Sequence, residues 1–217
     1  MTLKAGRFVT LEGGEGAGKS TQIKLLVAKL QSLGFEVVQT REPGGTPGAE
    51  AIRGLLVTGD VARWEADTEA LLHYAARAEH VAKTVKPALA RGAWVISDRF
   101  ADSTMAYQGY AGQVGRERIA ALHKLVLGEF QPDLTLILDL PVQEGLRRAG
   151  ARANATGSTE DRYERMGLPF HEALRAAFLD IARREPERCR VVDAAGGPDS
   201  VAAALWAALA ARFNLAA

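Results

Sequence analysis

The sequence has little of several features that would place it in a specialised class. It contains one cysteine, Cys189, so it cannot form an internal disulfide, and its four histidines do not show metal-ligand spacing. Its 27 basic residues are balanced by 26 acidic ones, without the basic excess typical of nucleic-acid-binding proteins. No apolar run has the length of a membrane span or the form of a secretory signal. We therefore expect a cytoplasmic protein with neither a nucleic-acid nor a membrane partner.

The apolar runs that are present follow the pattern of an α/β domain. The chain has 217 residues, of which 47% are hydrophobic, and this predicts a single domain over residues 1–217. Short apolar runs alternate with amphipathic helical patterns, which predicts a five-stranded parallel sheet with helices on both faces. The expected strands cover residues 8–11, 35–40, 93–97, 134–139 and 189–193. An alanine-rich stretch near the end of the chain, with Val201, Leu205, Leu209 and Phe213 four residues apart, predicts a packed terminal helix.

One internal segment does not show the pattern of a packed element. Residues 147–161 are rich in Arg, Gly, Ala, Ser and Thr. Such a composition between two helical patterns predicts a mobile lid within the domain.

A glycine-rich loop follows the first expected strand and precedes a helix. Residues 13–20 match G-x-x-x-x-G-K-[ST], and four of the eight are glycine. Glycines let the backbone N–H groups turn inward around phosphates, the lysine reaches the β- and γ-phosphates, and the serine hydroxyl ligates Mg²⁺. The sequence therefore predicts an ATP-binding loop made of Gly13, Gly14, Glu15, Gly16, Ala17, Gly18, Lys19, Ser20 and Thr21.

The loop alone does not identify what receives the phosphate. The sequence lacks N-K-x-D, which reads guanine in GTPases, and it lacks a strand ending in consecutive acidic residues, as in motor-type ATPases. A kinase of a small molecule remains, with a deoxynucleoside, a nucleoside monophosphate or shikimate as possible acceptors. A nucleotide-dependent switch that hydrolyses ATP slowly is a less favoured alternative.

Four motifs in order along the chain favour one acceptor. They are the phosphate loop with Glu15 inside it, Arg41-Glu-Pro-Gly-Gly-Thr46, Asp98-Arg-Phe followed by Ser103-Thr-Met-Ala-Tyr-Gln108, and Asp161-Arg-Tyr-Glu164. In these motifs the sequence resembles the thymidylate kinases over almost its whole length. The resemblance implies a P-loop nucleoside monophosphate kinase fold with a lid. It also implies a homodimer that transfers the γ-phosphate of MgATP to dTMP, giving dTDP and ADP in dTTP biosynthesis.

The resemblance also implies roles for individual residues. Glu15 would accept from the sugar 3′-hydroxyl. His73 stands where relatives often have a phenylalanine that stacks on thymine, and its smaller ring can still stack but can also titrate. Binding of dTMP is expected from Glu15, Glu42, Arg53, His73, Arg77, Arg99, Thr104, Tyr107, Gln108, Asp161 and Tyr163. Magnesium binding is expected from Ser20, Asp98 and Glu164.

The last expectation concerns the residues that place positive charge near the transferred phosphate. Some thymidylate kinases carry an arginine inside the phosphate loop, where this chain has Gly16, and others place arginines on the lid. The lid here offers Arg147, Arg148 and Arg152, with Arg162 beyond it. By its resemblance to the family's lid pattern, we expect catalytic charge from Lys19, Arg99, Arg148 and Arg152, and we expect the loop at residues 193–197 to pack against adenine.

Overall fold

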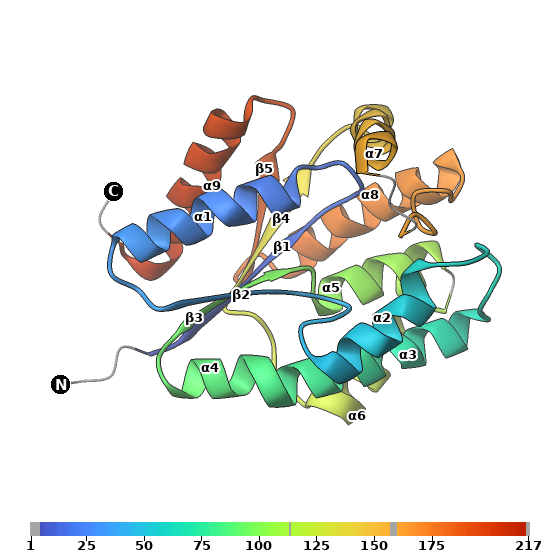
Figure 1. Cartoon of the computed structure of the whole chain (residues 1–217), viewed down its shortest axis with the longest axis horizontal. Coiled ribbons are helices and arrows are strands. Elements are labelled where there is room, and N and C mark those ends of the chain that lie inside the picture. The colour runs from blue at the N-terminus through green and yellow to red at the C-terminus, as the bar shows by residue number, and fades with distance from the viewer. Residues whose placement is uncertain (1–4, 113, 157–159, 216–217) are drawn as a thin grey trace.

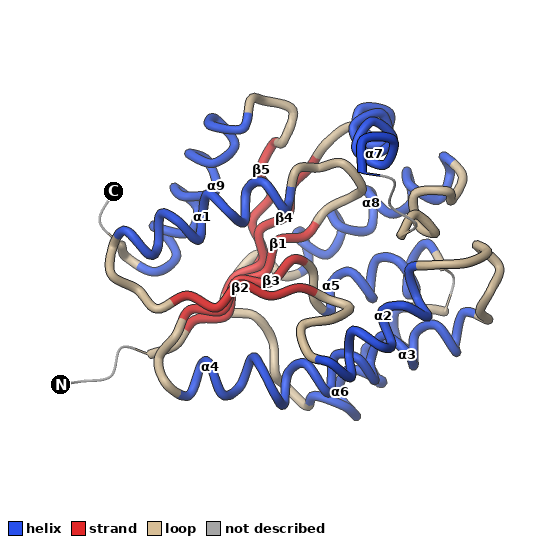
Figure 2. Tube along the Cα trace, in the orientation of Figure 1, coloured by secondary structure: helices blue, strands red, loops and turns tan. Residues whose placement is uncertain are grey.

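The computed structural model describes residues 5–112, 114–156 and 160–215; for residues 152–156 it describes the backbone only. Its centre is a parallel sheet of five strands in the order β2-β3-β1-β4-β5. The strands are β1 (Arg7–Glu12), β2 (Val37–Arg41), β3 (Trp94–Asp98), β4 (Leu134–Asp139) and β5 (Cys189–Asp193). The expected sheet is thereby confirmed, although β2 begins two residues later than the apolar run, at Val37. Figure 2 shows the strands together at the middle of the molecule.

Helices connect and cover these strands on both faces (Figure 1). None of the helices within the described residues is long and apolar enough to cross a membrane. The helical elements are α1 (Lys19–Ser32), α2 (Pro47–Val57), α3 (Ala66–His80), η1 (Val81–Val85), α4 (Lys86–Ala90), α5 (Ala101–Thr104), η2 (Met105–Ala111), α6 (Arg116–Leu127), α7 (Val142–Thr156), α8 (Leu168–Arg184) and α9 (Pro198–Phe213). η1 and η2 are π-helical.

The side chains of the central strands β1, β3 and β4 alternate between two buried layers, which is why these segments are mostly apolar. On one face, Leu136 and Leu138 of β4 pack with residues of α1 and α9. On the other face, Ile137 packs against α8 and η2, and Val95 of β3 packs against η1 and α4. The sheet is therefore buried on both sides, and its carboxyl-terminal edge is the place left for a ligand.

The segment expected to form a lid is more regular than its composition indicates. Residues 147–156 continue the helix α7, whereas residues 157–159 lie outside the described part of the chain. Glu144 accepts hydrogen bonds from Arg147 at 2.8 Å and from Arg148 at 2.7 Å. Such pairs at i+3 and i+4 stabilise a helix, and alanine and arginine are strong helix formers. The expected terminal helix is confirmed as α9, with Val201, Leu205 and Leu209 buried.

Candidate active site

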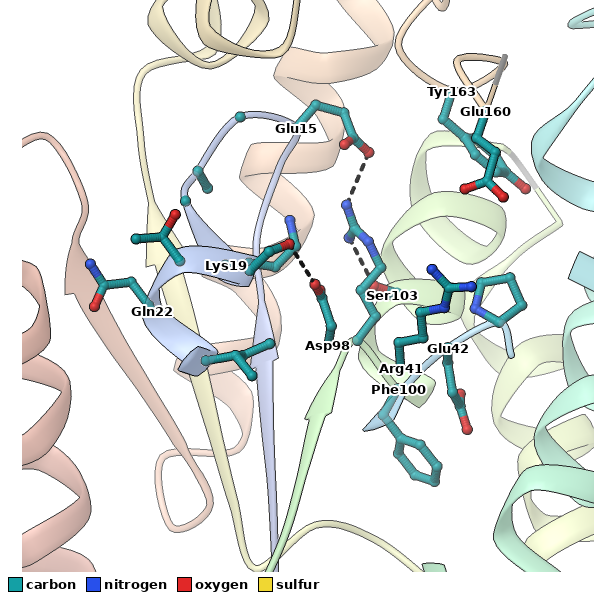
Figure 3. A pocket seen from close by; sticks show the side chains of 18 of the residues that line it. Glu15, Lys19, Gln22, Arg41, Glu42, Asp98, Phe100, Ser103, Glu160 and Tyr163 are labelled. Atoms are coloured by element: carbon teal, nitrogen blue, oxygen red, sulfur yellow. Dashed lines mark hydrogen bonds and ion pairs between the residues drawn. The ribbon is translucent and has the colours of Figure 1, made fainter. Parts of the chain in front are cut away.

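A cavity of about 1330 Å³ lies at the carboxyl-terminal edge of the sheet. The phosphate loop, the ends of β2 and β3, the helices α3 and η2, and residues 194–197 all contribute to its lining. In Figure 3, Lys19 and Asp98 lie in one part of the cavity and Glu160 and Tyr163 in another, with Glu15 between them. The cavity is large enough to hold two ligands side by side, since single small-molecule sites measure about 300–1,000 Å³.

The phosphate loop joins β1 to α1 and holds its lysine in place. Lys19 Nζ donates to the carbonyl oxygens of Gly13 at 3.0 Å and Gly14 at 2.9 Å. Burial, together with the positive charge of Arg99, lowers the pKa of Lys19 to about 8. Anionic phosphates bound beside this ammonium would raise its pKa again, because they favour the charged form.

Gly16 makes the closest backbone approach in the loop. Its φ is +67°, and a Cβ added there would lie 1.9 Å from the carbonyl oxygen of Gly145 in α7. A Cβ added at Gly145 would in turn lie 2.4 Å from the carbonyl oxygen of Glu15. The loop and the first turn of α7 are therefore in direct backbone contact, and any side chain at position 16 would separate them.

Two oxygen ligands lie together where the loop enters α1. Ser20 Oγ donates to Asp98 Oδ2 at 3.1 Å. Among the described residues, no three His, Cys, Asp or Glu side chains gather into a metal-binding group. Mg²⁺ in phosphate-transfer sites commonly takes one or two protein oxygens and completes its shell with waters and phosphate oxygens. The hydroxyl and carboxylate of this pair fit such a site.

Arg99 links the phosphate loop to η2. It adopts a φ of +70° directly after β3, a conformation that is uncommon for residues other than glycine. Its Nη1 donates to the carbonyl oxygen of Gly13 at 3.1 Å and to Ser103 Oγ at 3.0 Å, and its Nη2 donates to Glu15 Oε1 at 2.9 Å. Tyr107 donates its hydroxyl to the same Glu15 oxygen at 2.6 Å and presents its ring to the Arg99 guanidinium. A planar cation and a carboxylate are thus held side by side at the centre of the cavity.

A second buried arginine lies on α3. Arg77 is 2% exposed; its Nε donates to Glu42 Oε2 at 2.7 Å and its Nη2 donates to Thr104 Oγ1 at 2.9 Å. The other carboxylate oxygen of Glu42 lies 2.8 Å from His80 Nδ1. Arg77 Nη1 has no hydrogen-bond partner among the described residues. This leaves one buried donor of Arg77 for a ligand.

His73 and Tyr163 contact each other across the cavity. His73 Nε2 lies 2.9 Å from the Tyr163 hydroxyl oxygen, and the two rings are tilted by 43°. Burial lowers the pKa of His73 to about 3, and the positive charges of Arg77 and Arg162 add to the effect. His73 is therefore neutral near pH 7.

Arg53 and Arg148 are the remaining expected arginines with described side chains that line the cavity. Arg53 donates through Nη2 to Glu160 Oε2 at 2.8 Å and through Nη1 to the carbonyl oxygen of Pro43 at 2.8 Å. Arg148 lies 3.4 Å from the carbonyl oxygen of Ala194, so it reaches from α7 to the loop after β5. The side chain of Arg152, the other expected lid arginine, lies outside the described residues.

Comparisons with known proteins show which family the chain belongs to. The thymidylate kinase family model matches residues 11–204. The chain belongs to the thymidylate kinase family. It is 55% identical over 210 residues to a thymidylate kinase of Caulobacter vibrioides, covering 97% of this chain and 99% of that one. It is 52% identical to a thymidylate kinase of Bradyrhizobium sp. (strain BTAi1), covering 96% of this chain and 91% of that one.

A solved structure of a family member is also similar. The thymidylate kinase from Ehrlichia chaffeensis superposes with a TM-score of 0.74 at 34% identity, covering 94% of this chain and 98% of that one. The doubly wound sheet described above is thus the P-loop nucleoside monophosphate kinase fold expected from the sequence.

Most residues expected to bind substrate in a thymidylate kinase do line one cavity, but two of them, Thr104 and Glu42, contact Arg77, and Arg162 beyond the expected lid is buried. Thr104 is 1% exposed and is absent from the cavity lining, because its hydroxyl accepts from Arg77. Glu42 reaches the cavity wall, yet both its carboxylate oxygens are engaged by Arg77 and His80. Arg162 is 1% exposed and donates to backbone carbonyl oxygens, so it is not available as a lid arginine. Thr104 and Glu42 therefore accept hydrogen bonds from Arg77 and hold its side chain in place.

The structure also adds residues that the sequence did not single out. His80 supports Glu42, Glu160 engages Arg53, and Glu69 contacts both Gln108 and Arg162. His80 follows Arg77 at a spacing of three on the same helix, which is a signal that both side chains share a face. Glu69 and Glu160 meet partners 39 and 107 residues away in the chain, so no local pattern reveals them.

Proposed function

We propose that this chain transfers the γ-phosphate of MgATP to dTMP, giving dTDP and ADP. The observation that carries the proposal is a pair of buried polar atoms in residues that line the cavity. Arg77 Nη1, a donor, and Gln108 Oε1, an acceptor, have no hydrogen-bond partner among the described residues. Buried polar groups are rarely left unpaired, so these two atoms point to a ligand with an acceptor and a donor on one edge. Thymine presents this pattern through O4 and N3–H, whereas cytosine presents an amino group and an unprotonated ring nitrogen.

The centre of the cavity supports a deoxynucleoside monophosphate as the acceptor. Arg99 and Arg53 supply planar cations suited to a phosphate, and Glu15 supplies a carboxylate for the sugar 3′-hydroxyl. Tyr107 donates to Glu15 and borders the same space, where its ring would exclude a ribose 2′-hydroxyl. Asp161 and Tyr163 line the cavity beyond them.

Magnesium is proposed to bind at the start of α1 with ATP. Ser20 Oγ and Asp98 Oδ2 would hold it, and Glu164 lines the same cavity as a further carboxylate. When bound there, Mg²⁺ neutralises charge on the β- and γ-phosphates.

The chemistry requires alignment and positive charge more than covalent catalysis. The acceptor phosphate is a sufficient nucleophile once it is held in line with the γ-phosphate, and no covalent intermediate is needed. Lys19 and Arg99 border the transfer path, and Arg148 approaches from α7. We propose that Arg148 or Arg152 covers the transferred phosphate when residues 147–161 close as a lid, which also excludes water.

The decisive experiment measures ADP release with a panel of acceptors at equal concentration. dTMP, dCMP, dGMP, deoxythymidine and shikimate are compared under saturating MgATP, and the phosphorylated product is identified by mass spectrometry. We expect kcat/KM to be highest for dTMP. For each acceptor, the amount of phosphorylated product should equal the amount of ADP released. Equal rates across the panel, or ADP released without a phosphorylated acceptor, would refute the proposal.

Assembly and location are also proposed from family membership. We propose a homodimer, which sedimentation equilibrium tests directly. The single cysteine, Cys189, is free and buried, which supports the proposal of a reducing compartment such as the cytoplasm.

A further inference from the structure

Glu69 is a buried carboxylate that the proposed reaction does not use. It lies on α3, is 8% exposed, and accepts a hydrogen bond from Gln108 Nε2 at 2.6 Å. Its other oxygen pairs with Arg162 Nη1 at 2.5 Å. One side chain therefore joins a residue of the cavity wall to an arginine from the segment that follows α7.

Arg162 fixes the place of this carboxylate. Its guanidinium donates to the carbonyl oxygens of Leu56 at 3.2 Å, Asp60 at 3.0 Å and Val61 at 2.8 Å. With these backbone contacts the cation cannot turn away from Glu69. A guanidinium only donates hydrogen bonds, so Glu69 is the acceptor in its contact with Arg162 as well. An ionised carboxylate only accepts hydrogen bonds.

Because Glu69 only accepts hydrogen bonds, it determines the orientation of the Gln108 side-chain amide. A glutamine amide has one donating and one accepting end, and its orientation follows from its partners. Because Glu69 can only accept, the amide nitrogen of Gln108 faces Glu69 and the carbonyl oxygen faces away from it. That oxygen is the buried acceptor without a partner described above. Gln108 is 2% exposed and its neighbours leave it little freedom to turn.

We propose that Glu69 is a positioning residue for base selection: held by Arg162, it locks the Gln108 amide with its carbonyl oxygen toward the donor on the base. This inference rests on the proposed function, because it assumes a pyrimidine with a ring N–H at that place. Glu69 itself does not touch the substrate. Its effect on dTMP passes through Gln108.

A double-mutant cycle tests the proposal. Glu69→Gln removes the negative charge at nearly constant shape, so the Gln108 amide can present either end to the base. We expect KM for dTMP to rise about tenfold with kcat and KM for ATP nearly unchanged, since one buried hydrogen bond to the bound base is lost. Adding Glu69→Gln to Gln108→Met should then raise KM for dTMP no further.

A matched control lies on the same helix. Asp67→Asn makes the same acid-to-amide change in α3, but Asp67 is exposed and pairs with the exposed Arg118 at 2.7 Å. Its KM for dTMP should equal that of the wild type. If Glu69→Gln raises KM equally in the presence and absence of Gln108, its effect is only structural and the proposal is wrong. If the wild type itself shows no preference for dTMP, the proposed function fails instead.

A measurement on the wild-type protein covers the case in which Glu69→Gln does not fold. With ¹⁵N-glutamine labelling, and the Gln108 signal assigned by its loss in Gln108→Met, NMR can locate the amide protons of Gln108 in the dTMP complex. We expect nuclear Overhauser contacts from these protons to the methylene groups of Glu69. Contacts from the amide protons to the thymine ring, with none to Glu69, would overturn the proposal.

Discussion

Gly16 offers the sharpest test of how the phosphate loop meets α7. Gly16→Ala places a methyl group 1.9 Å from the carbonyl oxygen of Gly145, a distance that no packed structure tolerates. It also forces a residue with a Cβ to hold a φ of +67°. The left-handed conformation costs about 1–2 kcal/mol, and overpacking of a tight contact costs about 1–3 kcal/mol more. We therefore expect the free energy of unfolding to fall by about 2–5 kcal/mol.

Urea unfolding followed by circular dichroism measures this change, and Gly14→Ala is the matched control. Gly14 lies in the same loop, but an added Cβ there meets no atom within 4 Å. Its free energy of unfolding should stay within about 0.5 kcal/mol of the wild type, as for substitutions that create no clash. If Gly16→Ala is as stable as Gly14→Ala, the described contact between the loop and α7 is wrong.

The same substitution should reduce turnover. Relief of the overlap requires the first turn of α7 to move away from the loop, and Arg148 would move with it because it lies on the next turn. We expect kcat to fall together with stability. If Gly16→Ala is destabilised but keeps the full kcat, the position of α7 does not affect turnover.

Two further predictions concern Arg148 and His73. Arg148→Ala should lower kcat by about tenfold or more in steady-state assays. Arg147→Ala should leave kcat unchanged, because the Arg147 side chain is 69% exposed and does not line the cavity. If both substitutions lower kcat equally, Arg148 has no specific role in phosphate transfer. His73→Phe should reduce acid sensitivity: the pKa of His73 is about 3 when folded and near 6.5 when unfolded, so the wild type loses stability as pH falls below 6.5. Between pH 7 and pH 5 this residue accounts for about 2 kcal/mol of the wild-type loss in unfolding free energy, and an identical loss in His73→Phe would contradict the assignment.

The sheet and the phosphate loop could be predicted because their signals are local. The three central strands, β1, β3 and β4, are mostly apolar, since strands of a parallel sheet that are covered on both faces leave little room for polar side chains. Gly13 to Ser20 run without interruption from the end of β1 into the first turn of α1, so spacing alone identifies them. Residues 147–156 were harder to predict, because their helix is reinforced by Glu144, which precedes the segment expected to form a lid.

The supporting residues of the site could not be predicted for a different reason. Sequence gives the charge of an arginine but not its burial, so Arg162 resembled a lid cation although three carbonyl oxygens hold it inside the protein. Thr104 likewise has the right chemistry to contact a base, and only the fold places its hydroxyl on Arg77. The neutral state of His73 depends on burial and on Arg77, which is also a property of the assembled site.

The two residues that would read the base are supported in the same way. Arg77 is held by Glu42, and Gln108 is held by Glu69, and each acidic partner is itself fixed by a further side chain. Each pair leaves one buried polar atom for the ligand. Because the cost of ordering these groups is met on folding, dTMP would bind without reorganising them. On the ATP side, by contrast, Arg148 reaches the cavity from α7, whose first turn meets the loop in a close backbone contact between Gly16 and Gly145. We therefore expect base selection to be built into the core, and phosphate transfer to depend on movement of α7.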